Sequence, residues 1–396
     1  MNLPVFRLNK NADKRLLGGH LWIYSNEIDN NFSPLKSVSP GDEVVVENFQ
    51  GKPLGIASIN PNTLICGRLL TRDVKQPFEK VISVRFQNAL KLRQLIFDVP
   101  CYRLVFGESD WLPGLVIDRF FDTVVIQVST AGMEKYIPQI IESLEKLIKP
   151  KTILLKNDGK MREAEGLPID IRWLKGEGRE TTLLEENGVK FRAPLIKGQK
   201  TGWFYDHRMN RARLKDYVKG KRVLDVFSYI GGWGIQAATF GASEVLLNDS
   251  SAFALEMVDE QTRLNKLENI KTLQGDAFKT MENLIADNEK FDVVILDPPA
   301  FIPRRKDINK GMAAYKKANQ QALQLLRDDG GVLFSASCSM HLSIENHKET
   351  IRQAGRKNGR FIQVLEQGHQ AADHPVHPSI PETEYLKTFV VYSKVI

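Results

Sequence analysis

One cysteine near the C-terminal end of the chain raises the question of covalent chemistry. Cys338 lies between two serines in the stretch FSASCSM, residues 334–340, and is one of three cysteines in 396 residues. A cysteine thiolate is a strong nucleophile, although a thiol with an ordinary pKa of about 8.5 is only a few per cent ionised at neutral pH. Cysteine is also a common small core residue. The rest of the sequence has to decide between these two interpretations.

Glycines and carboxylates follow successive hydrophobic runs in the same half of the chain. The first run leads into SYIGGWG, whose glycines allow the backbone to approach a ligand closely. Later runs end in Asp249, in Gly275-Asp276 and in Asp297-Pro298-Pro299. Asp249 stands at about the distance from the glycine turn at which a carboxylate accepts hydrogen bonds from ribose hydroxyls. Each aspartate alone is also typical of a helix N-cap or a turn, but their recurrence at successive strand ends favours a ligand site.

The elements that would position these residues alternate between strand and helix from about residue 195. β-rich runs at 223–227, 244–249, 270–276, 291–297 and 331–337 are separated by helical patterns such as 253–267 and 313–329. This alternation predicts right-handed crossovers and a mostly parallel, Rossmann-like sheet with helices on both faces. Ligands of such sheets bind beyond the carboxyl ends of the strands. Neither GxGxxG nor GxxxxGK[ST] occurs, which disfavours dinucleotide and P-loop sites.

Two smaller domains are expected before this α/β domain, because 396 residues exceed the usual size of one hydrophobic core. Strand patterns at 41–47, 51–59 and 63–71, separated by turn residues, predict a small β-barrel. Helical patterns at 78–96 and 133–148, with strands between and after them, predict a small α+β domain. The predicted domains are residues 1–75, 76–190 and 191–396.

Composition limits the classes of partner and compartment. Hydrophobic residues make up 42% and charged residues 26% of the chain, without an apolar run long enough to cross a bilayer. The N-terminal residues do not resemble a signal peptide, so we expect a cytoplasmic protein with no membrane partner. The net charge of +7 suits a polyanionic partner. No metal is expected, and the histidine-containing segment 369–387 is predicted to be a structured loop.

The motifs together resemble those of a known family. In order and spacing, Asp225 with the glycine turn, Asp249, Gly275-Asp276 and DPP resemble class I S-adenosylmethionine-dependent methyltransferases. Over its full length the chain resembles the RNA cytosine-5 methyltransferase family of large-subunit rRNA methyltransferase I, which has an N-terminal PUA domain, a middle domain and a C-terminal Rossmann-like domain. The resemblance rests on KTGWFYDHRMNR at 200–211, FSYIGGWG, DPPAF, SCS and AADHP at 371–375.

This resemblance implies S-adenosylmethionine as the cofactor. The glycine turn would line the methionine part of the cofactor, Asp249 would hold the ribose, and Asp276 would bind the adenine amino group. The segment around Thr201 would enter the cofactor pocket. The implied cofactor-binding residues are Lys200, Gly202, Asp206, Arg208, Phe227, Ser228, Gly231, Gly232, Asp249, Asp276, Asp297 and Pro298.

The resemblance also implies a covalent mechanism on 23S rRNA or a pre-ribosomal large subunit. Because carbon 5 of cytosine is a poor nucleophile, the Cys338 thiolate would first add to carbon 6, and Asp297 would bind the N3 and amino edge of the base. Ala300 stands where many RNA cytosine-5 methyltransferases have a second cysteine, which implies a single-cysteine scheme with an unassigned base for the carbon 5 proton. The candidates for activating the thiol are Arg304, Lys306 and His341.

Two alternatives remain open from the sequence. DPP followed by Phe301 also resembles the loop of enzymes that methylate an exocyclic amine or a ring nitrogen of a base, which need no thiol. An RNA-binding assembly factor without catalytic activity is the other alternative. The sequence does not determine which cytosine is modified, whether the chain forms a homodimer, or whether the substrate is naked rRNA or an assembling subunit.

Overall fold

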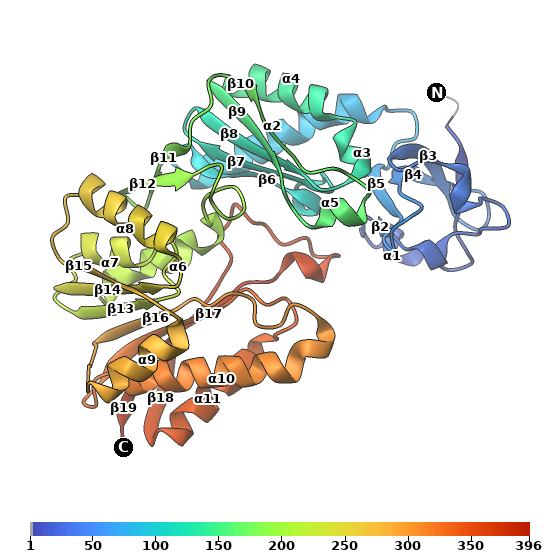
Figure 1. Ribbon diagram of the computed structural model, residues 1–396. Coiled ribbons are helices and arrows are strands. Elements are labelled where there is room, and N and C mark those ends of the chain that lie inside the picture. The colour runs from blue at the N-terminus through green and yellow to red at the C-terminus, as the bar shows by residue number, and fades with distance from the viewer. Residues whose placement is uncertain (1–2) are drawn as a thin grey trace. The chain divides into compact units, whose positions relative to one another are not determined.

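The computed structural model describes residues 3–396, which form two compact units. The first unit extends to residue 183 and also contains residues 193–205 and 372–383. The second unit contains residues 184–192, 206–371 and 384–396. The chain therefore passes repeatedly between the units, and Figure 1 shows its course in colour from the N-terminus to the C-terminus. Within the first unit, residues 372–383 are tied down because the Asp373 carboxylate accepts a hydrogen bond from the Arg103 backbone N–H at 2.9 Å.

The first unit begins with a small five-stranded β-structure. Its strands are β1 (Val5–Arg7), β2 (Trp22–Ile23), β3 (Asp42–Glu47), β4 (Pro53–Ile59) and β5 (Gly67–Thr71), in the order β1-β3-β4-β5-β2, with the short helix α1 (Lys14–Leu17). Val44 and Val46 on β3 are fully buried, whereas Val45 between them is partly exposed. The strands predicted at 41–47, 51–59 and 63–71 are confirmed as β3, β4 and β5.

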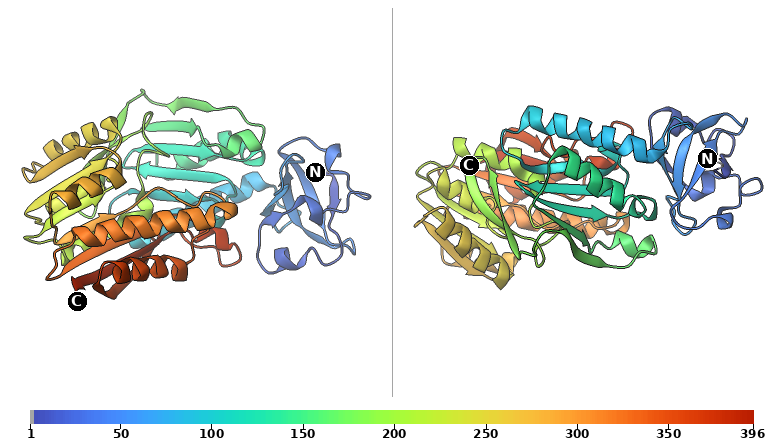
Figure 2. Two further views of the ribbon diagram at one scale, coloured as in Figure 1. Left: turned by 60° about the horizontal axis from the view of Figure 1, so that its bottom comes forward. Right: turned by 90° about the horizontal axis from the view of Figure 1, so that it is seen from above.

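A second five-stranded sheet with helices completes the first unit. It has the order β10-β9-β8-β7-β6. Its strands are β6 (Cys101–Phe106), β7 (Leu115–Phe120), β8 (Thr123–Val128), β9 (Thr152–Asn157) and β10 (Asp170–Lys175). The helices are α2 (Phe78–Ile96), α3 (Ala131–Glu134), α4 (Ile137–Leu147) and α5 (Met161–Ala164). α2 and α4 share one core with the sheet, and both helices are visible beside it in Figure 2.

One helix prediction in this region is wrong in part. The helix expected over 133–148 is broken into α3 and α4, whereas α2 has the predicted bounds. The Thr130 hydroxyl caps α3 by accepting a hydrogen bond from the Met133 N–H. Pro138 stands in the first turn of α4, where its missing N–H costs no intrahelical hydrogen bond. The proline therefore starts a new helix instead of continuing the preceding one.

The second unit is built on a seven-stranded sheet in the order β15-β14-β13-β16-β17-β19-β18. Its strands are β13 (Arg222–Val226), β14 (Glu244–Asp249), β15 (Ile270–Gln274), β16 (Val293–Leu296), β17 (Gly331–Ser337), β18 (Arg360–His369) and β19 (Lys387–Val395). β13 to β17 pair in parallel, and β19 pairs antiparallel with both β17 and β18. The five predicted strands and their parallel arrangement are confirmed, and so is the α/β class of this domain.

Helices cover both faces of this sheet, as Figure 1 shows. α7 (Gly234–Thr239) and α8 (Ala252–Leu264) contact each other on one face, and α9 (Ala277–Ala286), α10 (Ile308–Leu325) and α11 (Ile344–Lys357) form a layer on the other. The short α6 (Arg208–Ala212) precedes β13. The hairpin of β11 (Thr181–Glu186) and β12 (Val189–Pro194) crosses the boundary between the two units.

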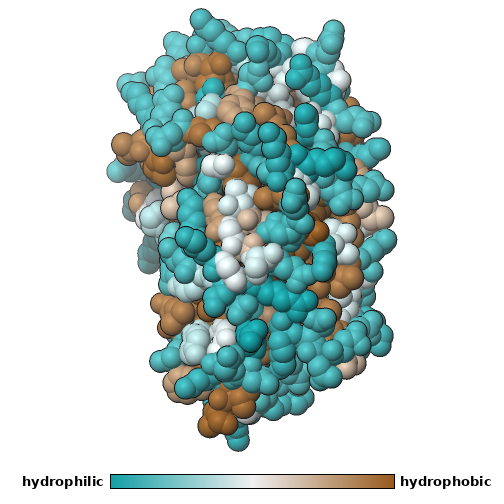
Figure 3. Space-filling view, turned by 90° about the vertical axis from the view of Figure 1, so that its left-hand side faces the viewer, coloured by the Kyte–Doolittle hydropathy of each residue, from teal (hydrophilic) through white to brown (hydrophobic). Residues whose placement is uncertain are grey.

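No helix among residues 3–396 is long and apolar enough to span a bilayer. Figure 3 shows one face on which hydrophilic residues predominate and hydrophobic side chains occur only in small, scattered groups. Scattered apolar side chains of this kind are ordinary on a protein surface.

Candidate functional site

The carboxyl ends of four parallel strands lie side by side along one edge of the seven-stranded sheet, the edge that runs across the strand ends. Val226 on β13 lies opposite Asn248 on β14 and opposite Leu296 on β16. Leu296 in turn lies opposite Ser335 on β17. Neighbouring strands are about 5 Å apart, so the residues that follow these four strands gather along one edge. The expected pairing of the fourth and fifth strands, which carry Asp297 and Cys338, is therefore observed.

The loop after β13 has a strained backbone. Phe227 and Tyr229 both adopt positive φ angles, of 63° and 49°, which are unusual for aromatic residues. The strain is held by hydrogen bonds from the Ser228 N–H to the Asn248 carbonyl at 3.0 Å and from the Tyr229 N–H to the Asp249 carboxylate at 2.8 Å. Such strained backbone often occurs at ligand sites. The loop is thus fixed to the end of β14.

Asp225 anchors the glycine turn from within the core. Its carboxylate is fully buried and accepts a hydrogen bond from the Gly234 N–H at 2.8 Å. Burial raises the pKa of Asp225 well above its ordinary value, although the Gly234 hydrogen bond opposes this shift. A Cβ at position 234 would lie 2.6 Å from Leu247 Cδ2, so only glycine fits there without movement. The turn and α7 therefore pack closely against β14.

Asp249 and Asp276 both act as local backbone acceptors. The Asp249 carboxylate also accepts a hydrogen bond from the Ser251 N–H at 2.9 Å, and the carboxylate is partly exposed. Asp276 is exposed and caps α9 by accepting a hydrogen bond from the Lys279 N–H at 3.0 Å. The capping interpretation that the sequence allowed is thus correct for Asp276. It does not exclude a ligand, because a carboxylate has further lone pairs.

Asp297, directly after β16, is held by two side chains that the sequence reasoning did not select. The Trp233 indole N–H donates to its Oδ2 at 3.0 Å, and His207 Nε2 lies 3.2 Å from its Oδ1. Burial alone would raise the pKa of Asp297, but the nearby His207 and Trp233 outweigh this effect and hold the pKa below its ordinary value. Asp297 is therefore an ionised acceptor at neutral pH. The following Pro298 is buried.

Cys338 follows β17 and is partly exposed, unlike the other two cysteines, which are buried. A hydroxyl network lies beside it: the Ser337 hydroxyl donates to the Tyr315 hydroxyl at 2.8 Å, and the Tyr315 and Ser339 hydroxyls are 2.7 Å apart. The Ser339 hydroxyl also accepts a hydrogen bond from the Ile302 N–H at 3.2 Å. This network connects the end of β17 to α10 and to the loop after β16. The partly exposed Cys338 thus follows a strand end that this network holds in place.

Lys387 is a further residue beside Cys338 that the sequence reasoning missed. It is the first residue of β19 and pairs with Ser337 in the antiparallel register. Its ammonium group donates to the carbonyls of Ser339 at 2.7 Å and Tyr385 at 2.8 Å. No local sequence signal marks Lys387, because its proximity depends on the insertion of β19 between β17 and β18.

Some of the predicted residues lie elsewhere or make structural contacts. Lys200 and Gly202 belong to the first unit, where the Lys200 ammonium lies 4.5 Å from the centre of the Phe204 ring. In the second unit, the Asp206 carboxylate accepts a hydrogen bond from the Tyr385 hydroxyl at 2.6 Å. Arg208 Nε lies 3.7 Å from a Glu186 carboxylate oxygen.

The three candidates for activating the thiol form another ion pair or lie at least partly at the surface. The Arg304 guanidinium pairs with Asp307 at 3.1 Å, Lys306 is exposed, and His341 is partly exposed. Ala300 is exposed in the loop after the two prolines. The segment 369–387, which was predicted to be a loop, begins at the last residue of β18 and ends at the first residue of β19. The described residues contain no group of three or more His, Cys, Asp or Glu side chains arranged to hold a metal.

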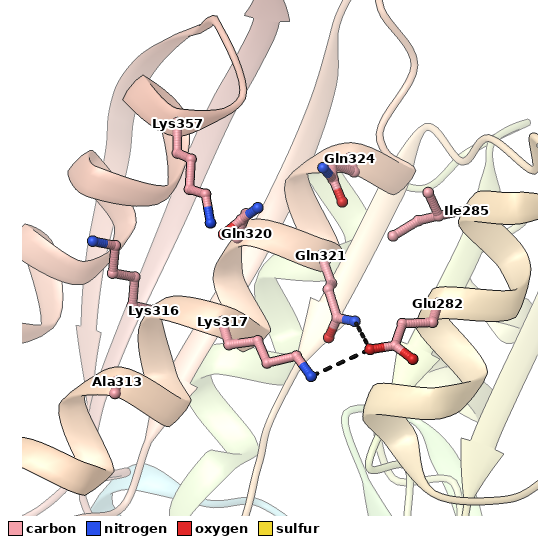
Figure 4. A pocket seen from close by; sticks show the side chains of 9 residues that line it. All are labelled: Glu282, Ile285, Ala313, Lys316, Lys317, Gln320, Gln321, Gln324 and Lys357. Atoms are coloured by element: carbon pink, nitrogen blue, oxygen red, sulfur yellow. Dashed lines mark hydrogen bonds and ion pairs between the residues drawn. The ribbon is translucent and has the colours of Figure 1, made fainter.

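A shallow groove on the helical layer of the second unit is not the candidate site. It lies between α9, α10 and α11, and Figure 4 shows the side chains that line it. Its charged residues are paired in part, because Glu282 binds the Lys317 ammonium at 3.2 Å and the Gln321 amide at 3.4 Å. The groove contains neither a strand end nor a nucleophile. The chemistry-bearing residues are instead at the edge of the sheet.

Comparisons with known proteins agree with this arrangement. A family model for S-adenosylmethionine-dependent methyltransferases matches residues 165–376, and one for PUA-like domains matches residues 6–72. Ribosomal RNA large subunit methyltransferase I of Cronobacter sakazakii is 34% identical over 392 residues, which are 97% of this chain and 98% of that protein. The protein of the same name from Escherichia coli O139:H28 is 35% identical over 389 residues, which are 96% of this chain and 97% of that protein.

A solved structure shares the fold over nearly the whole chain. The crystal structure of SMU.776, described as a methyltransferase complexed with SAH, has a TM-score of 0.83 at 21% identity and covers 98% of this chain and 100% of that chain. A second solved structure, described as a SAM-dependent methyltransferase from Streptococcus mutans, has a TM-score of 0.82 at 21% identity with the same coverage. At this identity the likeness shows the fold.

Proposed function

We propose a target atom for this chain, which belongs to the ribosomal RNA large subunit methyltransferase I family and is an S-adenosylmethionine-dependent methyltransferase. The target is carbon 5 of a cytosine in 23S rRNA. The observation that carries the proposal is the position of Cys338. Cys338 is partly exposed directly after β17, next to β16, which Asp297 follows, whereas Cys66 and Cys101 are buried. A methyltransferase that acts on a nitrogen atom has no use for a nucleophile at this position.

The edge of the sheet fits the cofactor of this family. The Ser228 hydroxyl and one Asp225 carboxylate oxygen are buried without a hydrogen-bond partner among residues 3–396. Buried polar atoms of this kind usually have a partner, so they are suited to a polar ligand. S-adenosylmethionine supplies an activated methyl group when it is bound. We propose that Phe227, Ser228, Gly231 and Gly232 line its methionine part and that Asp249 binds its ribose.

The remaining cofactor contacts are proposed from the same resemblance. Asp276 would accept a hydrogen bond from the adenine amino group while it continues to cap α9. Pro298 would restrict the loop that carries Asp297. Asp206 and Arg208, in the second unit, would support the pocket through their contacts with Tyr385 and Glu186. The cofactor contacts of Lys200 and Gly202 remain predictions from the sequence motif at 200–211.

Cys338 would act as a covalent catalyst. Its thiolate adds to carbon 6 of the cytosine, so that a carbon–sulfur bond forms and the electron pair of the carbon 5–carbon 6 bond becomes available at carbon 5. Carbon 5 would then take the methyl group that the bound cofactor supplies, as the bond between this methyl group and the sulfonium sulfur breaks and its electron pair stays on the sulfur. Loss of the carbon 5 proton returns an electron pair to the ring, and the carbon–sulfur bond breaks to release the thiolate. Since position 300 is alanine, no second cysteine is available there, and Cys338 alone would both attack carbon 6 and leave it.

Asp297 would bind the edge of the cytosine. Its carboxylate is ionised and is already oriented by Trp233 and His207, which leaves lone pairs for the protonated N3 and the amino group of the adduct. A fixed negative charge at this position favours the N3-protonated, positively charged form of the base, and this protonated ring takes up the electron pair that thiolate addition delivers. The base is expected to be turned out of its helix to reach the thiol.

The proposal is tested by replacing the nucleophile. Cys338→Ala is expected to bind S-adenosylmethionine normally and to lose methylation of 23S rRNA, because no carbon–sulfur bond can form. Cys101→Ala is the matched control, since Cys101 is buried in the first unit and should leave the reaction unchanged. RNA with 5-fluorocytosine at the target should trap a covalent adduct with the unmodified enzyme and not with Cys338→Ala. Full activity of Cys338→Ala would overturn the covalent mechanism.

Methylation of an exocyclic amine or a ring nitrogen is the second candidate, favoured by Asp297-Pro298-Pro299 followed by Phe301. The same variant separates the two candidates, because transfer to nitrogen requires no thiol. Mapping methylated bases in rRNA from cells with and without the protein identifies the target atom directly. An unchanged map of methylated bases would exclude both candidates and would favour an assembly role.

A further inference from the structure

The ammonium group of Lys387 is fixed beside the residues on both sides of the Cys338 thiol. Lys387 lies opposite Ser337 in the register of β17 and β19, and its Nζ donates to the Ser339 carbonyl at 2.7 Å. A second hydrogen bond at 2.8 Å joins Nζ to the Tyr385 carbonyl. Two of the three N–H donors of the ammonium are thus occupied by backbone carbonyls, which hold the group in one position.

Lys387 is buried, with a relative exposure of 6%. Burial lowers the pKa of Lys387 to about 8, while the nearby Cys338 and Glu384 act in the opposite direction. A lysine with this pKa is still mainly protonated at neutral pH, and it exchanges its proton readily with a thiol whose ordinary pKa is about 8.5. A buried ammonium without a nearby anion is costly, so the thiolate form of Cys338 suits this position.

The other titratable groups around Lys387 do not replace it as a cation. His347 on α11 is fully buried, and burial lowers its pKa to about 3, so it is neutral. Tyr315 on α10 is buried, and burial raises its pKa, so it is neutral as well. Glu384 is exposed just before β19. His369 on β18 lies opposite Lys387, and its Nδ1 is 2.7 Å from the Gln370 carbonyl.

We propose that Lys387 is the positioning residue that generates and holds the Cys338 thiolate. The step starts from the neutral amine form of Lys387: the S–H bond breaks, an N–H bond forms on the Nζ lone pair, and the electron pair of the S–H bond stays on the sulfur. The resulting ammonium and thiolate form an ion pair on the rigid support of Ser337, Ser339 and Tyr315. The same ammonium stabilises the thiolate again when it leaves carbon 6. This inference rests on the proposed function, because it names the group that activates its nucleophile.

The test measures the reactivity of the thiol in the absence of RNA. The rate of alkylation by iodoacetamide is followed from pH 5 to pH 10, and Cys338→Ala supplies the background, since the other cysteines are buried. Lys387→Met removes the charge and keeps the length of the side chain. It is expected to shift the pH midpoint of alkylation upward by about one unit, which lowers the rate near pH 7 about tenfold. Lys387→Arg keeps the charge and should restore most of the rate.

A matched control lies on the same strand. Lys394 on β19 is exposed, and Lys394→Met should leave the alkylation profile unchanged. Thermal unfolding and S-adenosylmethionine binding report whether each variant is folded. An unshifted midpoint in Lys387→Met would overturn the proposal, and so would equal slowing at every pH, which indicates a structural role alone. If Lys387→Met does not fold, the alkylation midpoint of Lys387→Gln is compared with that of the charge-retaining Lys387→Arg. Equal midpoints in these two variants would also refute the proposal.

This readout is independent of the substrate. A shifted alkylation midpoint together with no 5-fluorocytosine adduct would reject cytosine as the target and still support the ion pair. An adduct together with an unshifted midpoint would reject Lys387 and keep the covalent mechanism. The two proposals can therefore fail separately.

Discussion

Replacing Trp233 by phenylalanine should change the pH range in which the enzyme works. The substitution removes the indole N–H that donates to Asp297 at 3.0 Å and leaves His207, at 3.2 Å, as the remaining side-chain partner. A hydrogen bond to a charged group contributes about 1.5–3 kcal/mol, and one pKa unit corresponds to about 1.4 kcal/mol. The pKa of Asp297 in Trp233→Phe should therefore rise by about one to two units.

The sign of the effect follows from the lowered pKa of Asp297 in the folded protein. The ionised carboxylate stabilises the fold above the ordinary carboxyl pKa, and this contribution is lost as the pH falls through the folded-state pKa. In Trp233→Phe the loss begins at a higher pH. The acid limb of the methylation rate should move upward by the same one to two units, which initial rates with 23S rRNA at pH 4 to 7.5 would measure.

Tyr217→Phe is the matched control for this prediction. Tyr217 and Trp233 both pack edge-on against the ring of Phe334, at 5.6 and 5.9 Å between ring centres. The Tyr217 hydroxyl donates to Glu366 instead of Asp297, so its removal should leave the acid limb in place. An acid limb that stays fixed in Trp233→Phe, or that moves equally in Tyr217→Phe, would refute the reasoning about Asp297.

Three further predictions concern stability and the cofactor site. Asp276→Ala should lower the free energy of unfolding by about 1 kcal/mol through loss of the α9 cap, measured by urea unfolding, whereas Asp276→Asn should keep the cap. Gly234→Ala should cost about 1–3 kcal/mol, because its Cβ would lie 2.6 Å from Leu247 Cδ2, and calorimetry should also show weaker S-adenosylmethionine binding; a variant as stable as the parent would contradict this. Burial lowers the folded-state pKa of His347 to about 3, so the free energy of unfolding should fall as the pH drops from about 6.5 towards 3. His347→Gln should reduce this pH dependence. Equal urea midpoints of the parent and His347→Gln at pH 4.5 would show that His347 is not its source.

The four neighbouring strands β13, β14, β16 and β17 were predictable because most of their residues are buried. Strands of a parallel sheet appear as continuous hydrophobic runs, and β14 and β17 have the predicted bounds. β18 and β19 were not predicted; β18 lies at the edge of the sheet and most of its residues are at least partly exposed, whereas most of β19 is buried. Strand pattern alone does not identify an edge strand of this composition.

The site was predictable where it depends on strand order and not where it depends on packing between distant segments. The ends of β16 and β17 had to lie side by side once the parallel sheet was assumed, which brought Asp297 and Cys338 to one edge. His207 and Trp233 occur inside the recognised motifs, but their contact with Asp297 depends on tertiary packing. Lys387 depends on an antiparallel insertion that no local signal predicts.

The interleaving of the two units has a consequence for synthesis on the ribosome. Residues 372–383 belong to the first unit, and the Asp373 carbonyl accepts a hydrogen bond from the buried Arg93 at 3.0 Å. The N-terminal unit therefore cannot complete its own interior until almost the whole polypeptide has emerged from the exit tunnel. The nascent first unit should remain open to proteases until late in elongation, and the two units should mature together instead of in the order in which they are made.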